Sequence, residues 1–180
     1  MQRVSKAQWL ETALEVLETD GINGVRVEVL AKRLSISKSG FYWHFRNRED
    51  LLTDLLDHWR YELTEVISTN PEVQELDPKS RLIRINEMVH DSSLTRYDIA
   101  IRQWALSDKD AARVVRRVNQ IRSDFVGQAF SELGFRGDQL EMRTMLFVCY
   151  VSMEEPFFRE ISRKRRRELI NRRVELLISK

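Results

Sequence analysis

His90, Asp91 and Ser92 are the residues whose types come nearest to catalytic machinery, because they combine a base, an orienting acid and a nucleophile. Adjacent residues on a helix point in different directions, so these three cannot form a relay without a distant partner. The 3 histidines, His44, His58 and His90, also lack the spacing of zinc ligands. We therefore expect neither an enzyme nor a metal site, and the sequence implies no cofactor.

A second kind of chemistry, the binding of nucleic-acid phosphates, depends on where charges are placed. The chain has 30 lysine and arginine residues against 28 acidic ones, a net charge of +2, so its total charge does not indicate a nucleic-acid binder. The acids of the first fifty residues lie mostly at Glu11, Glu15, Glu18, Glu49 and Asp50, whereas the stretch from Lys32 to Arg48 contains none. We expect this acid-free stretch to face DNA.

The elements that position these residues are predicted to be helices, which makes the fold class all-α. Hydrophobic residues are 42% of the chain, with only 6 Gly and 3 Pro. Apolar residues recur at spacings of three and four. This pattern predicts helices at 6–19, 27–34, 38–44, 47–68, 79–93, 95–106, 109–133, 138–155 and 158–179.

The short helices 27–34 and 38–44 are joined by Ser35-Ile36-Ser37, the layout of a helix-turn-helix that pushes its second helix into a major groove. On periodicity alone, two short helices of an ordinary core explain the pattern equally well. The residues themselves are more specific. The run Leu30-Ala31-Lys32-Arg33-Leu34-Ser35-Ile36-Ser37-Lys38-Ser39-Gly40-Phe41-Tyr42-Trp43-His44-Phe45, followed by Arg46-Asn47-Arg48-Glu49-Asp50-Leu51-Leu52, resembles the signature of the tetracycline-repressor (TetR) family.

This resemblance is specific over about residues 5 to 60 and extends beyond them only to length, helical character and helix order. It implies a three-helix DNA-binding domain at 1–46. It also implies a helical regulatory domain at 47–180 that binds a ligand and dimerises, with helix 47–68 as the connector.

The resemblance makes 38–44 the recognition helix. The residues it implies as DNA contacts are Arg26, Ser37, Lys38, Ser39, Gly40, Tyr42, Trp43, His44 and Arg48. Lys38 can reach a phosphate or a guanine edge, hydroxyl groups can bond phosphate oxygens, and Gly40 lets the backbone approach closely. Arg48 is similar to the family's phosphate clamp at a helix N-terminus, with an ordinary exposed arginine as the alternative. Phe41 and Phe45 are expected to anchor the helix to its core.

Two positions depart from the family pattern. Val25-Arg26-Val27 stands where the family usually has Ser or Thr, which removes a hydroxyl cap and a phosphate contact that Arg26 can replace only electrostatically. Ser35 occupies a turn position that is commonly Gly, and it carries strain if its φ is positive.

A helix-turn-helix of this size reads few base pairs, so specificity normally needs a dimer on two half-sites. The resemblance implies that the last two helices form a four-helix bundle with their mates. The candidate interface residues are Met142, Met145, Leu146, Cys149, Met153, Ile161, Leu169, Ile170, Val174, Leu177 and Ile178. The alternative is that these faces pack within one chain, and part of each is expected to do so.

Family members usually enclose a ligand between the middle helices. Candidate lining residues are Tyr97, Arg102, Trp104, Phe125, Phe147 and Tyr150, although each can equally be core. The basic run Arg163 to Arg167 with Arg172 and Arg173 is interpreted as a solvated helical face that pairs with nearby acids, and a second nucleic-acid contact or a targeting signal is the alternative.

The sequence thus predicts a DNA-binding transcriptional regulator, in its commoner family mode a repressor, whose homodimer binds a palindromic operator and is released by an unidentified small-molecule effector. The alternatives are an activator of the same fold, a helical interaction module with no operator, and an enzyme. No signal peptide or membrane-spanning stretch is visible and Cys149 is the single cysteine, so we expect a soluble cytoplasmic protein without membrane partners.

Overall fold

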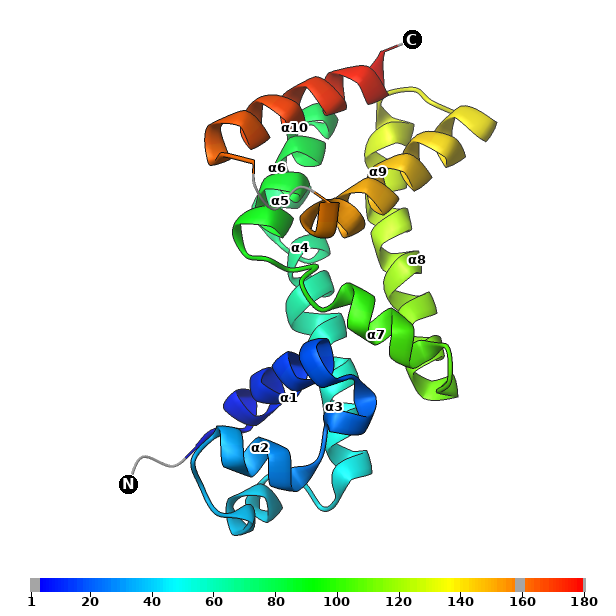
Figure 1. Cartoon of the computed structure of the whole chain (residues 1–180). Helices are drawn as coiled ribbons and strands as arrows, with labels where there is room; N and C mark the ends of the chain where they lie inside the picture. The colour runs from blue at the N-terminus through cyan, green and yellow to red at the C-terminus, as the bar shows by residue number, and fades with distance from the viewer. Residues whose placement is uncertain (1–3, 158–160, 180) are drawn as a thin grey trace. The chain divides into compact units, whose positions relative to one another are not determined.

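The computed structural model describes residues 4–157 and 161–179, and over these residues the chain forms helices and no strand (Figure 1). This confirms the predicted all-α class. The α-helices are α1 Lys6–Asp20, α2 Val27–Arg33, α3 Arg48–Arg60, α4 Val66–Ser68, α5 Pro71–Gln74, α6 Pro78–Asp91, α7 Asp98–Ala105, α8 Lys109–Glu132, α9 Gly137–Phe157 and α10 Arg163–Ile178. None of the described helices is long and apolar enough to cross a membrane.

Three short segments depart from α geometry. Two are 3₁₀ helices, η1 at Ile22–Gly24 and η2 at Lys38–Trp43, and the third is a π-helical turn, η3, at Tyr61–Glu65. The predicted recognition helix is therefore a 3₁₀ helix. The predicted connector 47–68 is α-helical to Arg60, passes through η3 and resumes as α4.

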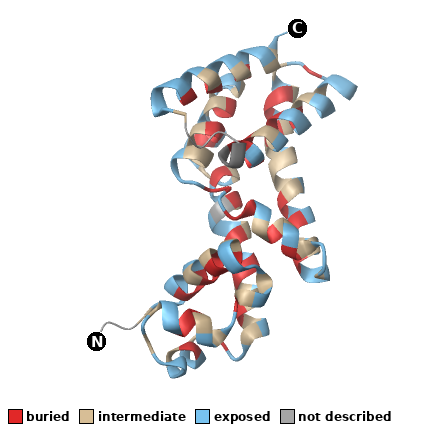
Figure 2. Cartoon of the chain, viewed as in Figure 1, coloured by how far each residue is buried: buried red, intermediate tan, exposed pale blue. Residues whose placement is uncertain are grey.

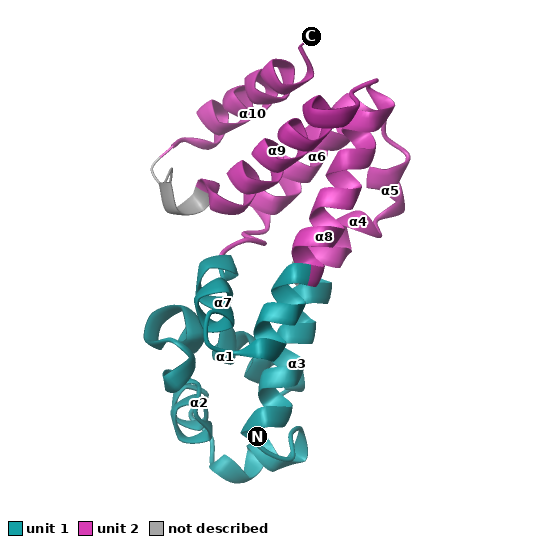
Figure 3. Ribbon diagram, turned by 90° about the vertical axis from the view of Figure 1, so that its right-hand side faces the viewer, with its two compact units in different colours: residues 1–62, 97–116 teal, residues 63–96, 117–180 magenta. Residues whose placement is uncertain are grey.

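The chain divides into two compact units (Figure 3). Unit 1 comprises residues 1–62 and 97–116, and unit 2 comprises residues 63–96 and 117–180. The expected DNA-binding domain 1–46 lies within unit 1. Its boundary after residue 46 stays a prediction, because the units group residues by contact and not by function.

The helix ends of unit 1 follow from local sequence. At the start of α1, Ser5 and Gln8 form a capping box, in which each side chain accepts a hydrogen bond from the other residue's backbone amide. Gly21 ends α1 with a positive φ of 68°. Asn47 caps α3 by accepting from the Asp50 amide at 2.8 Å, as its sequence position predicts.

The core of unit 1 anchors η2 through aromatic rings. Trp9, Phe41 and Phe45 are at most 2% exposed. The Phe41 ring meets Trp9 edge-on with centroids 5.5 Å apart and lies 5.0 Å from Phe45. This confirms the anchoring role expected of Phe41 and Phe45. Figure 2 shows buried positions lining one side of α1 and α3 while η2 also carries exposed ones.

Unit 2 has its own core, which is built from α4, α5, α6, α9, α10 and the later part of α8. Phe130 is fully buried in it, with its ring edge-on to Phe135 and Phe147 at centroid distances of 6.1 and 6.2 Å. Asp77 caps α6 by accepting from the amides of Lys79 and Ser80, and Pro78 is the first residue of the helix.

Candidate DNA-binding site and candidate ligand pocket

The turn between α2 and η2 holds the two elements in helix-turn-helix order. Ser35 has a positive φ of 55°, the conformation foreseen at the position where the family commonly has Gly, so a non-glycine residue carries strain there. The Ile36 amide donates to the Ala31 carbonyl at 3.0 Å, which closes the turn. Arg26 occupies the N-cap position of α2, and it forms no side-chain cap hydrogen bond, consistent with the missing hydroxyl noted in the sequence.

The outer side of η2 presents aromatic and polar groups. Tyr42 is 64% exposed and Trp43 is 74% exposed, unusually high values for large aromatic residues. The hydroxyls of Ser37 and Ser39 lie 2.7 Å apart and are hydrogen-bonded to each other. A Cβ added to Gly40 would lie 3.3 Å from the Ile36 side chain, so a small residue fits this close packing.

Several predicted DNA contacts already have partners within the chain. Lys38 Nζ donates to Glu28 at 2.9 Å, and Lys38 lowers the pKa of Glu28. His44 donates from Nε2 to the Val4 carbonyl at 2.9 Å, since a carbonyl oxygen can only accept. Arg46, which lies in the acid-free stretch but was not a predicted DNA contact, pairs with Asp50, and this pairing lowers the pKa of the Asp50 carboxyl. The acid-free stretch is therefore partly neutralised by acids just outside it.

Arg48 is half-buried and has a structural role in unit 1. Its Nε donates to the Val25 carbonyl at 2.7 Å, and one terminal nitrogen donates to the Ile22 carbonyl at 2.8 Å. These bonds tie the first turn of α3 to the backbone that precedes α2. A phosphate contact from Arg48 stays a prediction.

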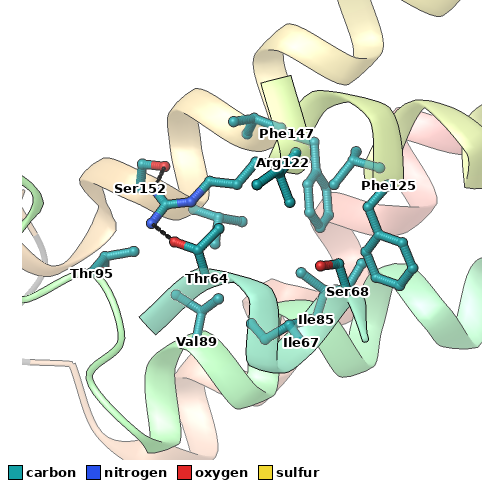
Figure 4. Close-up of a pocket in the computed structure, with 14 residues that line it drawn as sticks. Thr64, Ile67, Ser68, Ile85, Val89, Thr95, Arg122, Phe125, Phe147 and Ser152 are labelled. Carbon is teal, nitrogen blue, oxygen red and sulfur yellow. Dashed lines mark hydrogen bonds between the residues drawn. The ribbon is translucent and has the colours of Figure 1, made fainter. Parts of the chain in front are cut away.

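Unit 2 contains a largely apolar pocket of about 480 Å³, including its part open to solvent (Figure 4). It is lined by Thr64, Ile67, Ser68, Ile85, Val89, Thr95, Ile121, Arg122, Phe125, Val126, Phe147, Val148, Val151 and Ser152. Phe125 and Phe147 were candidates from the sequence. The polar residues Thr64, Arg122 and Ser152 were missed, because they are far apart in the sequence and no local pattern joins them.

The other four ligand candidates do not line this pocket. Tyr97 and Trp104 are buried in unit 1, where the Tyr97 hydroxyl donates to Glu11 at 2.8 Å. Arg102 lies on α7 in the same unit. Tyr150 stacks under the Arg173 guanidinium, 3.3 Å from the ring centroid, and burial raises its pKa. Ligand contacts from these four residues stay predictions.

The candidate dimer residues separate into two groups. On α9, Met142, Met145, Leu146 and Met153 are 36 to 56% exposed and Cys149 is also exposed. On α10, Ile170 and Val174 are buried within unit 2, while Leu169, Leu177 and Ile178 are half-buried and Leu176 is 72% exposed. Ile161 is half-buried as well. Ile170 and Val174 thus pack within their own chain, the alternative foreseen for part of this face.

Comparisons with known proteins match the N-terminal part most specifically. Residues 10–55 match the family described as bacterial regulatory proteins, tetR family. The class C tetracycline repressor of Escherichia coli is 35% identical over 57 residues, which are 32% of this chain and 26% of that protein. The chain therefore spans about a quarter of the length of this relative. The matched family is one of regulatory proteins and not of enzymes, in agreement with the sequence-based expectation.

Solved structures extend the likeness to the whole fold. A transcriptional regulator from Rhodococcus sp. RHA1 aligns with a TM-score of 0.75 at 15% identity, over 97% of this chain and 96% of that one. AibR, solved in complex with isovaleryl coenzyme A and operator DNA, aligns with a TM-score of 0.74 at 20% identity, over 96% of this chain and 97% of that one. At these identities the likeness establishes a shared fold.

Proposed function

We propose that this chain, which belongs to the TetR family of bacterial regulatory proteins through its N-terminal domain, is a transcriptional regulator that binds a palindromic operator as a homodimer. The observation that carries the proposal is the surface of η2, where Lys38, Tyr42 and Trp43 are each more than half exposed. The buried Phe41 and Phe45 hold that surface in place. Exposed aromatic and cationic groups on an anchored helix suit a groove with phosphates on either side.

The exposed apolar residues of α9 support the homodimer. Met142, Met145 and Leu146 are each more than 40% exposed, and contiguous apolar surface of this kind favours a protein interface. We propose that this face of α9 pairs with its counterpart on a second copy. The dimer then presents two η2 segments to two half-sites.

Release by a small-molecule effector is the second part of the proposal, and repression is the proposed sign. The pocket of unit 2 supports an effector site, since it combines apolar walls with a few polar groups. The chain runs from Asn47 through α3 into η3, which carries the pocket residue Thr64. The structure of AibR with both an acyl thioester and operator DNA provides a precedent among proteins of this fold. We expect the protein to act in the cytoplasm, where operators are found.

Binding to a randomised duplex library, followed by sequencing of the retained DNA, tests the proposal. Wild type is compared with Lys38→Ala and Tyr42→Ala, and with the matched variants Lys109→Ala and Tyr61→Ala. All four side chains are exposed, so each variant is expected to fold with a stability change within about 0.5 kcal/mol. We expect wild type and both matched variants to retain one palindrome.

Lys38→Ala and Tyr42→Ala are expected to lose that palindrome or weaken its retention at least tenfold. If no sequence is enriched by the wild type, the operator proposal fails. If the η2 variants enrich the palindrome as well as the wild type does, η2 is not the recognition element. Lower target expression after deletion of the gene would contradict repression and indicate an activator.

A further inference from the structure

The pocket of unit 2 has two chemically different ends (Figure 4). At one end, Phe125, Phe147 and Ile67 provide apolar walls. At the other end lies the guanidinium of Arg122, between the side chains of Thr64 and Ser152. An occupant that satisfies both ends has an apolar body and one polar terminus.

The polar end offers hydrogen-bond donors that converge. Arg122 donates to Ser152 Oγ at 3.1 Å and to Thr64 Oγ1 at 3.0 Å. Each hydroxyl accepts from the cation and keeps its own hydrogen available to an oxygen placed in the pocket. Both hydroxyl residues are buried, Thr64 at 4% and Ser152 at 6% exposed, so bulk water competes weakly for those hydrogens. By contrast, the Ser68 hydroxyl uses its hydrogen on the Glu65 carbonyl.

Arg122 and Glu154 are charged groups near this end of the pocket. Arg122 brings a permanent positive charge to the lining. Glu154 lines a smaller space that shares Val89, Thr95 and Val151 with the pocket, and it is held by Arg166 and Arg173, each at 3.4 Å. The negative charge of Glu154 is therefore compensated by its own arginines.

We propose that the effector of this pocket is an apolar carboxylate, whose carboxylate group is bound by Arg122 with the Thr64 and Ser152 hydroxyls and whose hydrocarbon body lies against Phe125 and Phe147. This inference rests on the proposed function for its regulatory consequence, but not for the binding itself. A charge-assisted pair to arginine strengthens binding by about tenfold or more relative to a neutral polar terminus of the same size.

Calorimetric titration of the purified full chain tests this with hexanoate, octanoate and decanoate and with the amide of each. The amide keeps the chain length and the carbonyl oxygen and removes the charge. We expect at least one carboxylate of the series to bind, and its amide to bind at least tenfold more weakly. Absence of binding by all three carboxylates, or equal binding of acid and amide, would overturn the proposal.

Variants assign the binding to the polar end. Arg122→Gln is expected to abolish the preference for acid over amide, whereas Arg117→Gln, an exposed arginine on the same helix, is expected to keep it. Thr64→Val keeps the shape of the side chain and removes one hydroxyl donor. It is expected to weaken carboxylate binding less than Arg122→Gln does, and it tests the polar end if Arg122→Gln fails to fold. If Arg122→Gln and Thr64→Val both bind the carboxylate as the wild type does, the site lies elsewhere and the proposal is wrong.

Operator binding, measured in parallel, separates this inference from the proposed function. If the chain binds a selected operator but no carboxylate, the proposed ligand class is wrong and the proposed regulatory function stands. If the chain binds the carboxylate but no DNA sequence, the operator proposal is wrong and the proposed ligand class stands.

Discussion

Lys38 Nζ lies 2.9 Å from Glu28 Oε1, so an ion pair joins η2 to α2 on the surface proposed to meet DNA. Both side chains are more than half exposed. The hydrogen bond from Lys38 and its charge keep the pKa of Glu28 below its ordinary value, so this carboxylate is ionised near neutral pH. A phosphate that binds Lys38 must therefore compete with Glu28.

The first prediction is that Glu28→Gln tightens DNA binding. Removing the carboxylate frees Lys38 and takes away a charge that repels phosphate, and an exposed pair of this kind is expected to change affinity by about two- to fivefold at low salt. Fluorescence anisotropy with a labelled duplex measures the change. Glu141→Gln, an exposed acid of unit 2, is the matched control and should have no effect. Weaker binding by Glu28→Gln would mean that the Lys38–Glu28 pair positions η2 and does not compete with phosphate.

The second prediction concerns Arg48. Because its guanidinium donates to the carbonyls of Val25 and Ile22, we expect Arg48→Ala to destabilise the chain by about 1–3 kcal/mol, as partly buried acceptors lose a charged donor. Urea unfolding measures this loss. Arg46→Ala, which removes a surface pair, should cost less than about 1 kcal/mol.

Salt titration of DNA binding then separates the two roles of Arg48. If Arg48 also contacts a phosphate, the slope of log affinity against log salt becomes shallower by about 0.9 per protomer in Arg48→Ala. An unchanged slope with lower stability assigns Arg48 to positioning alone. Unchanged stability would contradict the structural role.

The third prediction is an acid-sensitive contribution from Glu132. Arg81 donates to Glu132 at 3.1 Å and lowers the pKa of its carboxyl below the ordinary value of 4.5. When a carboxyl has a lower pKa in the folded state than in the unfolded state, its ionisation stabilises the fold at pH values above the unfolded pKa. This stabilisation is lost as the pH falls through the folded pKa. Urea unfolding of wild type and Glu132→Gln should show wild type more stable at pH 7, with the difference shrinking as the pH falls below about 4.5. A difference independent of pH would show that ionisation plays no part.

The fourth prediction concerns Asn86, which is 1% exposed and whose side-chain nitrogen and oxygen lack hydrogen-bond partners. It lines a small space together with Val89, Thr95 and Glu154. Asn86→Leu is expected to stabilise the fold by about 1–3 kcal/mol, since it removes two unsatisfied polar atoms and fills the space. Thermal unfolding checks this, with exposed Asn171→Leu as a near-neutral control. Destabilisation by Asn86→Leu would indicate that bound water satisfies the amide.

Helix order and most helix ends were predictable because the signals are local. Asn47, Gly21 and the Asp77-Pro78 pair each set a terminus through their own backbone and side chains. The 3₁₀ geometry of η2 was not predictable, since spacings of 3.0 and 3.6 residues cannot be told apart over a segment as short as Lys38–Trp43. The π turn at Tyr61–Glu65 has no signal in the apolar pattern.

The position of η2 was predictable, and the pairing of its residues was not. The specific run from Leu30 to Leu52 located η2, whereas the partners of Lys38 and Arg48 depend on how separate segments pack. The polar end of the pocket joins residues 30 and 58 positions apart in the chain, a distance at which a single sequence carries no pattern. Periodicity likewise gave an apolar face for α10 and could not assign Ile170 and Val174 to the chain's own core.

Whether this chain is an operator-binding regulator is decided by equilibrium binding to the selected palindrome and to a scrambled duplex of equal length, measured from about 50 to 200 mM salt. We expect a preference of at least a hundredfold for the palindrome, and a fall in affinity of about a hundredfold or more across that range as phosphate contacts are lost. Equal affinity for the two duplexes, or affinity that does not change with salt, would contradict the claim that this chain is an operator-binding regulator.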